Sequence, residues 1–330
     1  MAQGALRVLI VGCGMMGALH AAAWHKAGAV VAGFVDERLE RARELASRYG
    51  AGAWADLDQA LAGAGPLDAA SICTPPAFHL DAMLALAGRG VHLLVEKPPT
   101  LTAAQCREAA ARVAEAGVSC MTGLTHRFYP EMRFAKEWIA SGRLGEILHV
   151  SDRIEADPAS LPPWYFDSAV AGGGILLTNG IHALDRVGWV MDRPARRVVW
   201  AATRNVFHPA GNVEDFAAVS VEHDGGLRSQ LTLLWAPGAA TRSVVEVVGT
   251  RGVLRVHSWQ GVTVLTPEEK IERSFYPEDA DFLQRTLVGI QAEVESFRRH
   301  LAEGHPLEGS LAEACRTMAL IEDAYRLSQG

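Results

Sequence analysis

The chain has 330 residues, of which 49% are hydrophobic, 21% charged and 7% aromatic, a composition typical of a globular protein with about two domains. This composition excludes a disordered chain, a collagen-like fibre and a small disulfide-rich scaffold. The formal net charge is −7, from 31 basic and 38 acidic residues, and no block of Lys or Arg occurs. The charge balance therefore argues against nucleic-acid and membrane-surface partners.

The cysteines and the N-terminal segment favour a cytoplasmic protein. The cysteines are five in number, scattered and without CxxC spacing, which predicts reduced, mostly buried thiols and not bridges or zinc ligands. No signal peptide is predicted, because a short apolar run leads directly into a strand. No stretch approaches the roughly 20 apolar residues that a membrane-spanning helix needs. The cysteines are Cys13, Cys73, Cys106, Cys120 and Cys315.

The first part of the chain, residues 1–122, alternates between short apolar runs and helical patterns. This alternation with short connections predicts right-handed crossovers and a parallel sheet. The apolar runs are continuous, as expected for strands that are buried on both faces. We therefore predict a doubly wound α/β domain. Its expected strands are 7–11, 30–35, 69–73, 91–95 and 118–122, and its expected helices are 16–27, 37–49, 77–87 and 103–116.

The pattern changes near Gly123. Most of the later apolar segments alternate with a period of two and flank glycine-containing turns, which predicts antiparallel hairpins with one covered face and one available face. Residues 123–330 are therefore predicted to form an α+β domain with a large, mainly antiparallel open sheet. Its expected strands are 147–154, 219–222, 227–234, 244–248, 252–256 and 262–265, and its expected helices are 131–140, a segment from about 175, 284–302 and 311–327.

A GxGxxG sequence, Gly12-Cys13-Gly14-Met15-Met16-Gly17, lies between the first strand and the first helix. Gly12 permits the tight turn, Gly14 allows a pyrophosphate to approach the backbone, and Gly17 allows close helix–strand packing. The following helix offers N–H groups and a partial positive charge to phosphates. This context predicts dinucleotide binding.

Asp36, at the end of the second expected strand, is placed to accept hydrogen bonds from an adenosine ribose. A 2′-phosphate beside this carboxylate would meet like-charge repulsion. NAD is therefore predicted over NADP, although Arg38 two residues later offers a partial counter-charge for a phosphate.

Two further segments carry polar residues suited to catalysis. Lys97 follows a buried strand, so it is expected at the carboxyl edge of the sheet, where ligands bind in open α/β folds; the alternative is a surface lysine. In the segment 172–185, three glycines precede Thr178, His182 and Asp185, which would share one polar stripe of a helix. Glycines permit close approach to a ligand, which favours a functional His182 over a core histidine.

These motifs together resemble the Gfo/Idh/MocA family of NAD(P)-dependent oxidoreductases, over nearly the whole chain. The resemblance implies a Rossmann dinucleotide-binding domain at 1–122 and a substrate-binding and oligomerisation domain at 123–330, forming a homodimer or homotetramer through its sheet. The motifs are Gly12–Gly17, Cys73-Thr74-Pro75-Pro76 with His79, Glu96-Lys97-Pro98, Arg127-Phe128, Gly142-Arg143-Leu144-Gly145 and Gly172–Asp185.

The resemblance also implies hydride transfer between nicotinamide and a carbinol carbon of a sugar, inositol or related polyol. By the family pattern, Lys97 contacts the reacting oxygen and His182 is the acid–base residue. A neutral imidazole can take the hydroxyl proton while an ammonium stabilises the developing alkoxide. The expected cofactor-binding residues are Gly12, Gly14, Met15, Met16, Gly17, Asp36, Arg38, Cys73, Thr74, Pro75, His79, Glu96 and Lys97.

The chain departs from the family pattern at Thr178, where many sugar and inositol dehydrogenases of the family have aspartate. Either Asn179 or Asp185 takes over part of that role, or the substrate differs from a plain inositol. The aromatic loop before the glycines could form platforms for a sugar face or pack the loop onto the core, and Arg127 could bind an anionic substituent or form an ion pair. The expected substrate-binding residues are Lys97, Arg127, Trp164, Tyr165, Thr178, Asn179 and His182.

No histidine–carboxylate spacing suggests a metal site. Two alternatives to a dehydrogenase stay open. One is a glycoside hydrolase that retains NAD and oxidises its substrate transiently, and the other is a non-catalytic binding protein that senses a dinucleotide. Resemblance of fold and motif does not by itself fix a substrate.

Overall fold

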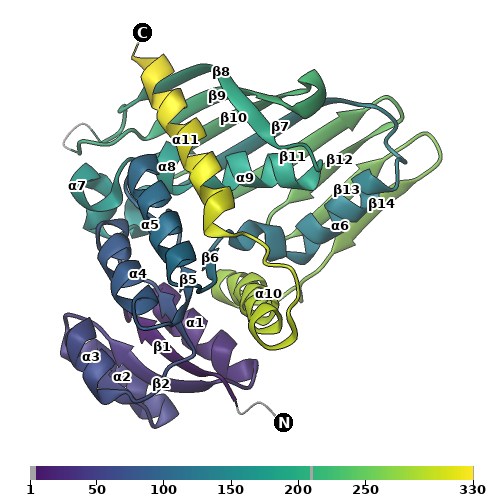
Figure 1. Ribbon diagram of the computed structural model, residues 1–330. Coiled ribbons are helices and arrows are strands. Elements are labelled where there is room, and N and C mark those ends of the chain that lie inside the picture. The colour runs from purple at the N-terminus through teal and green to yellow at the C-terminus, as the bar shows by residue number, and fades with distance from the viewer. Residues whose placement is uncertain (1–4, 209–210, 330) are drawn as a thin grey trace. The chain divides into compact units, whose positions relative to one another are not determined.

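The computed structural model describes the chain except residues 1–4, 209–210 and 330 (Figure 1). It divides into two compact units. Unit 1 comprises Met1–Gly123 with Ile290–Cys315, and unit 2 comprises Leu124–Gly289 with Arg316–Gly330. Within unit 1, the segment Ile290–Cys315 packs against the first part of the chain. For example, the rings of Trp24 and Phe297 meet edge-on with their centroids 6.2 Å apart.

Unit 1 contains a six-stranded sheet in the order β3-β2-β1-β4-β5-β6, with every pair of neighbours parallel. The central strands are mostly apolar and almost entirely buried, so the predicted doubly wound sheet is confirmed. Its elements are β1 (Arg7–Val11), α1 (Met15–Lys26), β2 (Val30–Val35), α2 (Leu39–Tyr49), β3 (Gly52–Trp54), α3 (Leu57–Gly63), β4 (Ala69–Ile72), the 3₁₀ turn η1 (Pro76–Phe78), α4 (His79–Ala87), β5 (His92–Val95), α5 (Ala103–Glu115) and β6 (Cys120–Thr122).

Unit 2 contains an eight-stranded sheet in the order β14-β13-β12-β11-β7-β10-β9-β8. Among its described strands only β7 and β10 pair in parallel, so the predicted mainly antiparallel sheet is confirmed. Its elements are the 3₁₀ turn η2 (Thr125–Phe128), α6 (Pro130–Ala140), β7 (Ile147–Ala156), η3 (Pro158–Ser160), η4 (Pro163–Phe166), α7 (Ser168–Ala171), α8 (Ile175–Thr178), α9 (Gly180–Val190), β8 (Ala195–Arg204), β9 (Phe216–His223), η5 (Asp224–Gly226), β10 (Arg228–Trp235), β11 (Arg242–Gly249), β12 (Gly252–His257), β13 (Gly261–Leu265) and β14 (Lys270–Ser274). Two last helices, α10 (Phe282–Glu303) and α11 (Leu311–Ser328), contribute to both units.

The two faces of the eight-stranded sheet differ. Helices α6 and α9 lie along one face (Figure 1), and there the strands place apolar side chains such as Val219 and Leu231 in the core. On the other face Trp200 of β8 is 55% exposed, and Arg228 at the start of β10 is exposed. The predicted alternation of a covered and an available face is therefore correct.

Strands β8 and β14 were not expected from the sequence. They form the two edges of the sheet, and both are rich in charged residues, including Arg196, Arg197, Lys270 and Glu272. Charged edge strands resist pairing with other chains, but they lose the apolar alternation by which a strand is recognised. In unit 1, β3 and α3 were missed as well, because a strand of three residues and a helix of seven are too short to show a clear period.

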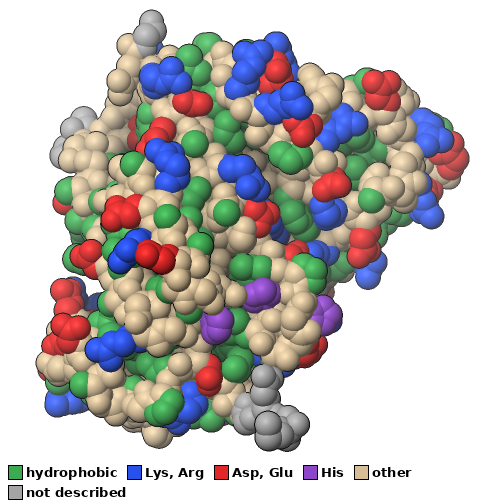
Figure 2. All heavy atoms as spheres, in the orientation of Figure 1, with side chains coloured by type: hydrophobic (Ala, Val, Ile, Leu, Met, Phe, Trp, Pro, Cys, Tyr) green, Lys and Arg blue, Asp and Glu red, His purple; other side chains and the backbone are tan. Residues whose placement is uncertain are grey.

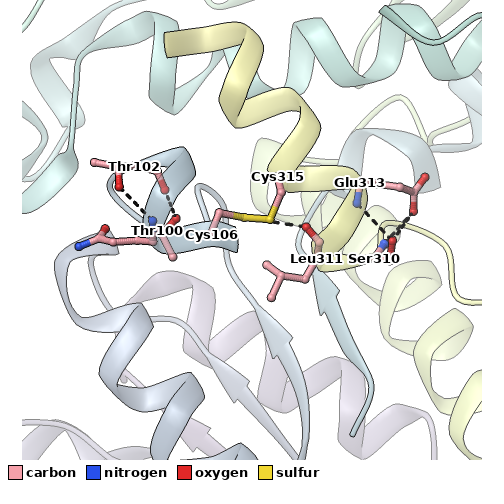
Figure 3. Close-up of a disulfide and its surroundings, with 8 residues drawn as sticks. Thr100, Thr102, Cys106, Ser310, Leu311, Glu313 and Cys315 are labelled. Carbon is pink, nitrogen blue, oxygen red and sulfur yellow. Dashed lines mark hydrogen bonds between the residues drawn. A yellow bond between two sulfur atoms is a disulfide. The ribbon is translucent and has the colours of Figure 1, made fainter. Parts of the chain in front are cut away.

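A disulfide joins Cys106 of α5 to Cys315 of α11 within unit 1 (Figure 3). The prediction of reduced thiols is wrong for this pair and holds for Cys13, Cys73 and Cys120, which are free. The cysteines are 209 residues apart in sequence, yet their Cα atoms lie 5.4 Å apart. The spacing of cysteines along the sequence could not predict this disulfide, because its two helices come together only in the folded protein.

The surface shows no single charged patch in the view of Figure 2, where basic and acidic side chains are interspersed. No helix in the described part of the chain is long and apolar enough to cross a membrane.

Candidate active site

The glycine loop of unit 1 is packed against the segment after β4. Gly12 has φ +94°, and a Cβ there would lie 2.6 Å from the carbonyl carbon of Cys73. A Cβ on Gly17 would lie 1.9 Å from the Gly12 oxygen, so both positions require glycine. A Cβ on Gly14 would meet nothing within 4 Å, so the loop is open at that residue. The open position lies at the N-terminus of α1, where backbone N–H groups and the helix dipole favour a phosphate.

Asp36 connects this loop to the end of β2. Its Oδ2 accepts a 2.8 Å hydrogen bond from the Cys13 N–H, and its Oδ1 accepts a 2.9 Å bond from the Arg38 N–H. A carboxylate has about four lone-pair positions, so ribose hydroxyls can still be bound. The Arg38 side chain itself is exposed. Asp36 therefore fixes the glycine loop in addition to its expected role beside a ribose.

His79 links the two other loops at this edge of the sheet. It is fully buried, with Nε2 2.7 Å from the Thr74 oxygen and Nδ1 2.9 Å from the Pro98 oxygen. Burial lowers the pKa of His79, although both carbonyl oxygens favour the charged ring. Since both ring nitrogens face backbone oxygens, His79 positions the loops, and a direct contact of its ring with a cofactor is left as a prediction.

Glu96 and Lys97 follow β5 at the carboxyl edge of the parallel sheet. The Glu96 carboxylate is buried, with Oε1 3.1 Å from Nε2 of His20 and Oε2 accepting the Lys97 N–H at 3.1 Å. Burial lowers the pKa of Lys97, and the charge of Glu96 opposes that shift. Lys97 therefore occupies an environment in which its charge depends on a neighbouring carboxylate.

In unit 2, the glycine run before α8 packs against protein groups. A Cβ on Gly174 would lie 1.8 Å from the Glu214 oxygen, and one on Gly173 would lie 2.4 Å from the Tyr325 hydroxyl. The Glu214 carboxylate accepts hydrogen bonds from the N–H groups of Gly174 (3.0 Å) and Leu176 (2.8 Å). These two glycines therefore serve close packing within the unit, which differs from the expected approach to a ligand.

The expected single helix is interrupted at Asn179, between α8 and α9. The buried Thr178 hydroxyl donates to the Gly174 oxygen at 2.8 Å. Asn179 Oδ1 accepts from Trp235 Nε1 at 3.1 Å, and since an indole nitrogen only donates, the NH₂ group of Asn179 is turned away from Trp235. The NH₂ group of Asn179 is therefore a hydrogen-bond donor held in a fixed orientation, whereas the Thr178 hydroxyl already donates its hydrogen to the backbone at the start of its own helix.

His182 lies in α9 with its ring stacked on His126 of η2. The centroids are 4.1 Å apart with 11° between the planes, and both side chains are buried. Behind this pair, Arg186 Nη1 is 2.6 Å from His126 Nδ1, and its Nε donates to Asp152 at 2.6 Å. No role was expected from the sequence for His126, Arg186 or Asp152. Arg186 lies four residues after His182 in α9, so their spacing indicated a shared helix face, whereas nothing in the spacing of His126 or Asp152 relates them to His182.

Arg127 and Asp185 form a buried ion pair within the same unit, with Arg127 Nε donating to Asp185 Oδ2 at 2.7 Å. This geometry favours the structural role of Arg127 over anion binding. The ion pair with Arg127 also engages the Asp185 carboxylate. Asp185 was one of the two residues expected to take over part of the role that an aspartate at position 178 has in many relatives.

The aromatic loop is partly packed and partly accessible. Trp164 and Tyr165 stack with centroids 4.0 Å apart, and both are half-buried. Tyr165 and Phe166 contact Trp235 of β10 edge-on. The contacts support packing of the loop, and the exposed parts of Trp164 and Tyr165 leave a platform role as a prediction.

No group of three or more His, Cys, Asp or Glu side chains among the described residues is arranged to hold a metal ion.

Models of a known family match both parts of the chain. Residues 6–124 match the oxidoreductase family with an NAD-binding Rossmann fold, and residues 132–255 match the Gfo/Idh/MocA C-terminal domain. The chain belongs to the Gfo/Idh/MocA family of oxidoreductases.

Curated relatives and solved structures agree with this assignment. The D-glucoside 3-dehydrogenase of Escherichia coli K12 is 32% identical over 204 residues, which is 60% of this chain and 58% of that protein. The rhizopine catabolism protein MocA of Rhizobium meliloti is 27% identical over 327 residues, 97% of this chain and 94% of the relative. The crystal structure of GenD2 from gentamicin A biosynthesis, in complex with NAD, superposes with a TM-score of 0.87 at 28% identity and covers 100% of this chain and 95% of that one.

Proposed function

We propose that the protein is an NAD-dependent dehydrogenase that acts on a carbinol carbon of a sugar, an inositol or a related polyol. The observation that carries the proposal is the family relationship across both domains, in which relatives such as a D-glucoside 3-dehydrogenase and an inositol 2-dehydrogenase act on such alcohols. The geometry of unit 1 is consistent with it, because the open Gly14 position, the α1 N-terminus and Asp36 suit a pyrophosphate and a ribose.

Bound NAD would supply the hydride acceptor, and the chain's own residues would do the rest. The backbone around Gly14 would hold the pyrophosphate, and Asp36 would bind the adenosine ribose and disfavour a 2′-phosphate. His182 would take the hydroxyl proton of the substrate on its imidazole. The Lys97 ammonium would stabilise the alkoxide oxygen as it forms.

Asn179, with its amide fixed by Trp235, is proposed to donate a hydrogen bond to a substrate hydroxyl where many relatives have an aspartate at position 178. At this contact the protein would donate a hydrogen bond to the substrate, whereas an aspartate carboxylate would accept one. Trp164 and Tyr165 are proposed as apolar platforms for a sugar face. Expected substrates are therefore polyols or sugars whose recognition needs an acceptor oxygen near Asn179.

The proposed assembly is a homodimer or homotetramer that uses the available face of the eight-stranded sheet. Trp200, on that face, is 55% exposed. Size-exclusion chromatography with light scattering, on the wild type and on a Trp200→Arg variant, tests this. A monomeric wild type would rule the assembly out.

The direct test of the reaction is NADH formation at about 340 nm, with inositols, aldoses, amino sugars and sugar phosphates, each offered with NAD and with NADP. Activity with NAD that is lost in His182→Ala supports the proposal. Inactivity toward every substrate, combined with NAD that co-purifies with the protein, would contradict it in favour of a NAD-retaining hydrolase or a dinucleotide sensor.

A further inference from the structure

The described part of the connection between β8 and β9 is organised around a buried carboxylate. Asp215, directly before β9, is 1% exposed, and both of its oxygens accept backbone hydrogen bonds. Oδ1 accepts from the Val206 N–H at 2.8 Å, and Oδ2 accepts from the N–H groups of Phe207 at 2.6 Å and His208 at 3.0 Å. Because three successive N–H groups bind one carboxylate, the backbone that carries the His208 side chain is fixed.

The same carboxylate sets the position of the hydrogen on the His208 ring. Nδ1 of His208 lies 3.2 Å from Oδ2 of Asp215. A carboxylate only accepts, so the ring hydrogen lies on Nδ1, and the neutral ring keeps its lone pair on Nε2. Among the residues that the structure describes, none forms a hydrogen bond with Nε2, and the His208 side chain is 25% exposed. His208 therefore offers an accessible acceptor in a fixed orientation.

Two sets of contacts place this acceptor beside the aromatic loop. The His208 ring packs on the Phe166 ring with centroids 4.9 Å apart. Asn212 joins the two loops, since its Oδ1 accepts the Ser168 N–H at 2.7 Å and its own N–H donates to the Phe166 oxygen at 3.4 Å. His208 therefore has a defined place next to η4, the turn that carries the two residues proposed as a sugar platform.

The aromatic rings also connect His208 with the proposed donor Asn179. The Phe166 and Trp235 rings meet edge-on with centroids 5.8 Å apart, and Trp235 Nε1 donates to Asn179 Oδ1 at 3.1 Å. The Asn179 oxygen of the backbone in turn accepts the His182 N–H at 3.1 Å. All of these residues belong to unit 2. One acceptor and one donor therefore adjoin the same two aromatic rings.

The chemistry of these groups selects one class of ligand. A hydroxyl both donates and accepts, so a sugar or polyol can give a hydrogen to the imidazole lone pair and take one from an amide. Its C–H faces can also pack on aromatic rings. A fully ionised anion has no hydrogen to give to Nε2, and an apolar ligand would bury both polar groups without partners. The region therefore favours a neutral polyhydroxy molecule.

We propose that His208, oriented by Asp215, accepts a hydrogen bond from a substrate hydroxyl at its Nε2. This inference deepens the proposed function and rests on it, because the ligand is taken to be a sugar or polyol. His208 is then a residue of substrate recognition with no part in hydride or proton transfer. Its loss should weaken binding of the substrate.

The hydrogen position on His208 can be measured without any ligand. The full protein is labelled with ¹⁵N at the histidine ring nitrogens, and the His208 signals are identified by their absence in His208→Gln. Two-bond ¹H–¹⁵N correlations in mildly alkaline buffer distinguish a hydrogen on Nδ1 from one on Nε2. We expect it on Nδ1. A hydrogen on Nε2 overturns the proposal, because no lone pair would remain there to accept.

Binding is then measured by saturation-transfer NMR in the presence of NADH, with D-glucose, methyl D-glucoside and myo-inositol as probes. His208→Phe keeps the ring contact with Phe166 but removes the acceptor, so it should weaken the tightest-binding probe by roughly 5-fold. His208→Gln offers an amide oxygen in place of Nε2 and should recover part of that loss. Phe207→Ala is the matched control, since Phe207 is an exposed neighbour whose backbone N–H remains on Asp215.

Deoxyfluoro analogues of that probe identify the hydroxyl involved, because fluorine cannot donate. One analogue should bind the wild type and His208→Phe equally, although the parent probe does not. The proposal is overturned by equal affinity of the parent probe for the wild type and His208→Phe, by an equal loss in Phe207→Ala, or by no binding of any probe to the wild type.

The outcome is separable from that of the proposed reaction. NADH formation by the wild type, with the affinity unchanged in His208→Phe, would reject this inference and keep the dehydrogenase. Probe binding that weakens as expected in His208→Phe, in a protein that forms no NADH, would keep this inference and reject the reaction.

Discussion

His126 and His182 lie face to face, with ring centroids 4.1 Å apart and 11° between their planes. The Nδ1 of His126 faces the Arg186 guanidinium, which only donates, so the hydrogen of His126 lies on Nε2. The Asp152 carboxylate holds that guanidinium in turn. Arg186 fixes the tautomer and position of His126, and His126 in turn sets the ring plane of His182, the proposed acid–base residue.

His126→Ala should lower turnover by roughly 5-fold, since a stacked aromatic contact is typically worth about 1 kcal/mol. His126→Phe keeps the stack and should retain most of the activity, although it removes one acceptor of Arg186. Steady-state kinetics on both variants measure this difference. His25→Ala, at an exposed position of α1, is the control. Equal losses in the Ala and Phe variants would show that stacking is not the relevant contact.

Lys97→Ala should lower turnover by roughly 100-fold or more, because it removes the charge that stabilises the alkoxide. Binding of NAD, measured by calorimetry, should change little. Lys26→Ala is the matched control, because Lys26 is an exposed lysine of the same unit that donates to Gln291. Near-normal turnover in Lys97→Ala would remove Lys97 from the mechanism.

Asp36→Asn should reduce the preference for NAD, because it removes the negative charge that repels a 2′-phosphate. Its amide oxygen can still accept the Cys13 N–H, so the glycine loop should stay folded. The measurement is the ratio of kcat/KM for NAD and NADP, with Glu37→Gln at the exposed neighbouring position as control. An unchanged ratio would exclude Asp36 as the ribose ligand.

The Cys106–Cys315 disulfide should stabilise unit 1 by an amount on the order of 2–5 kcal/mol, because it closes a long stretch of chain. Thermal unfolding with and without reductant tests this on the wild type and on the Cys106→Ser, Cys315→Ser double variant. Reductant should lower the Tm of the wild type alone. A wild-type Tm that does not respond to complete reduction, confirmed by thiol counting, would contradict this stabilisation.

The stability of the protein should fall in acid, in part through Glu96. Its pKa is lowered from the ordinary value of 4.5, since the hydrogen bond from His20 and neighbouring charges outweigh the opposing effect of burial. A lowered pKa contributes stability that is present above pH 4.5 and is lost as the pH falls through the folded-state value. Urea unfolding between neutral and acid pH should therefore show a weaker pH dependence in Glu96→Gln. An identical pH dependence in the variant and the wild type would show that Glu96 makes no such contribution.

The sequence by itself determined those features whose physical cause is local. The continuous apolar runs of β1, β4 and β5 require burial on both faces, and the spacing of Gly12, Gly14 and Gly17 is set by one tight turn into one helix. The same holds for Lys97, whose place at the end of a buried strand follows from the order of strand and loop.

Tertiary structure decided the partners of these residues. Glu96 receives its hydrogen bond from His20, 76 residues earlier, and His126 meets both His182 and the side chain of Arg186, 60 residues later. The glycines before α8 met Glu214 and Tyr325 instead of a ligand, and two cysteines 209 residues apart formed a bridge. Spacing along the chain determines which side chains share a helix or strand face, whereas contacts between distant elements arise only when the core packs them together.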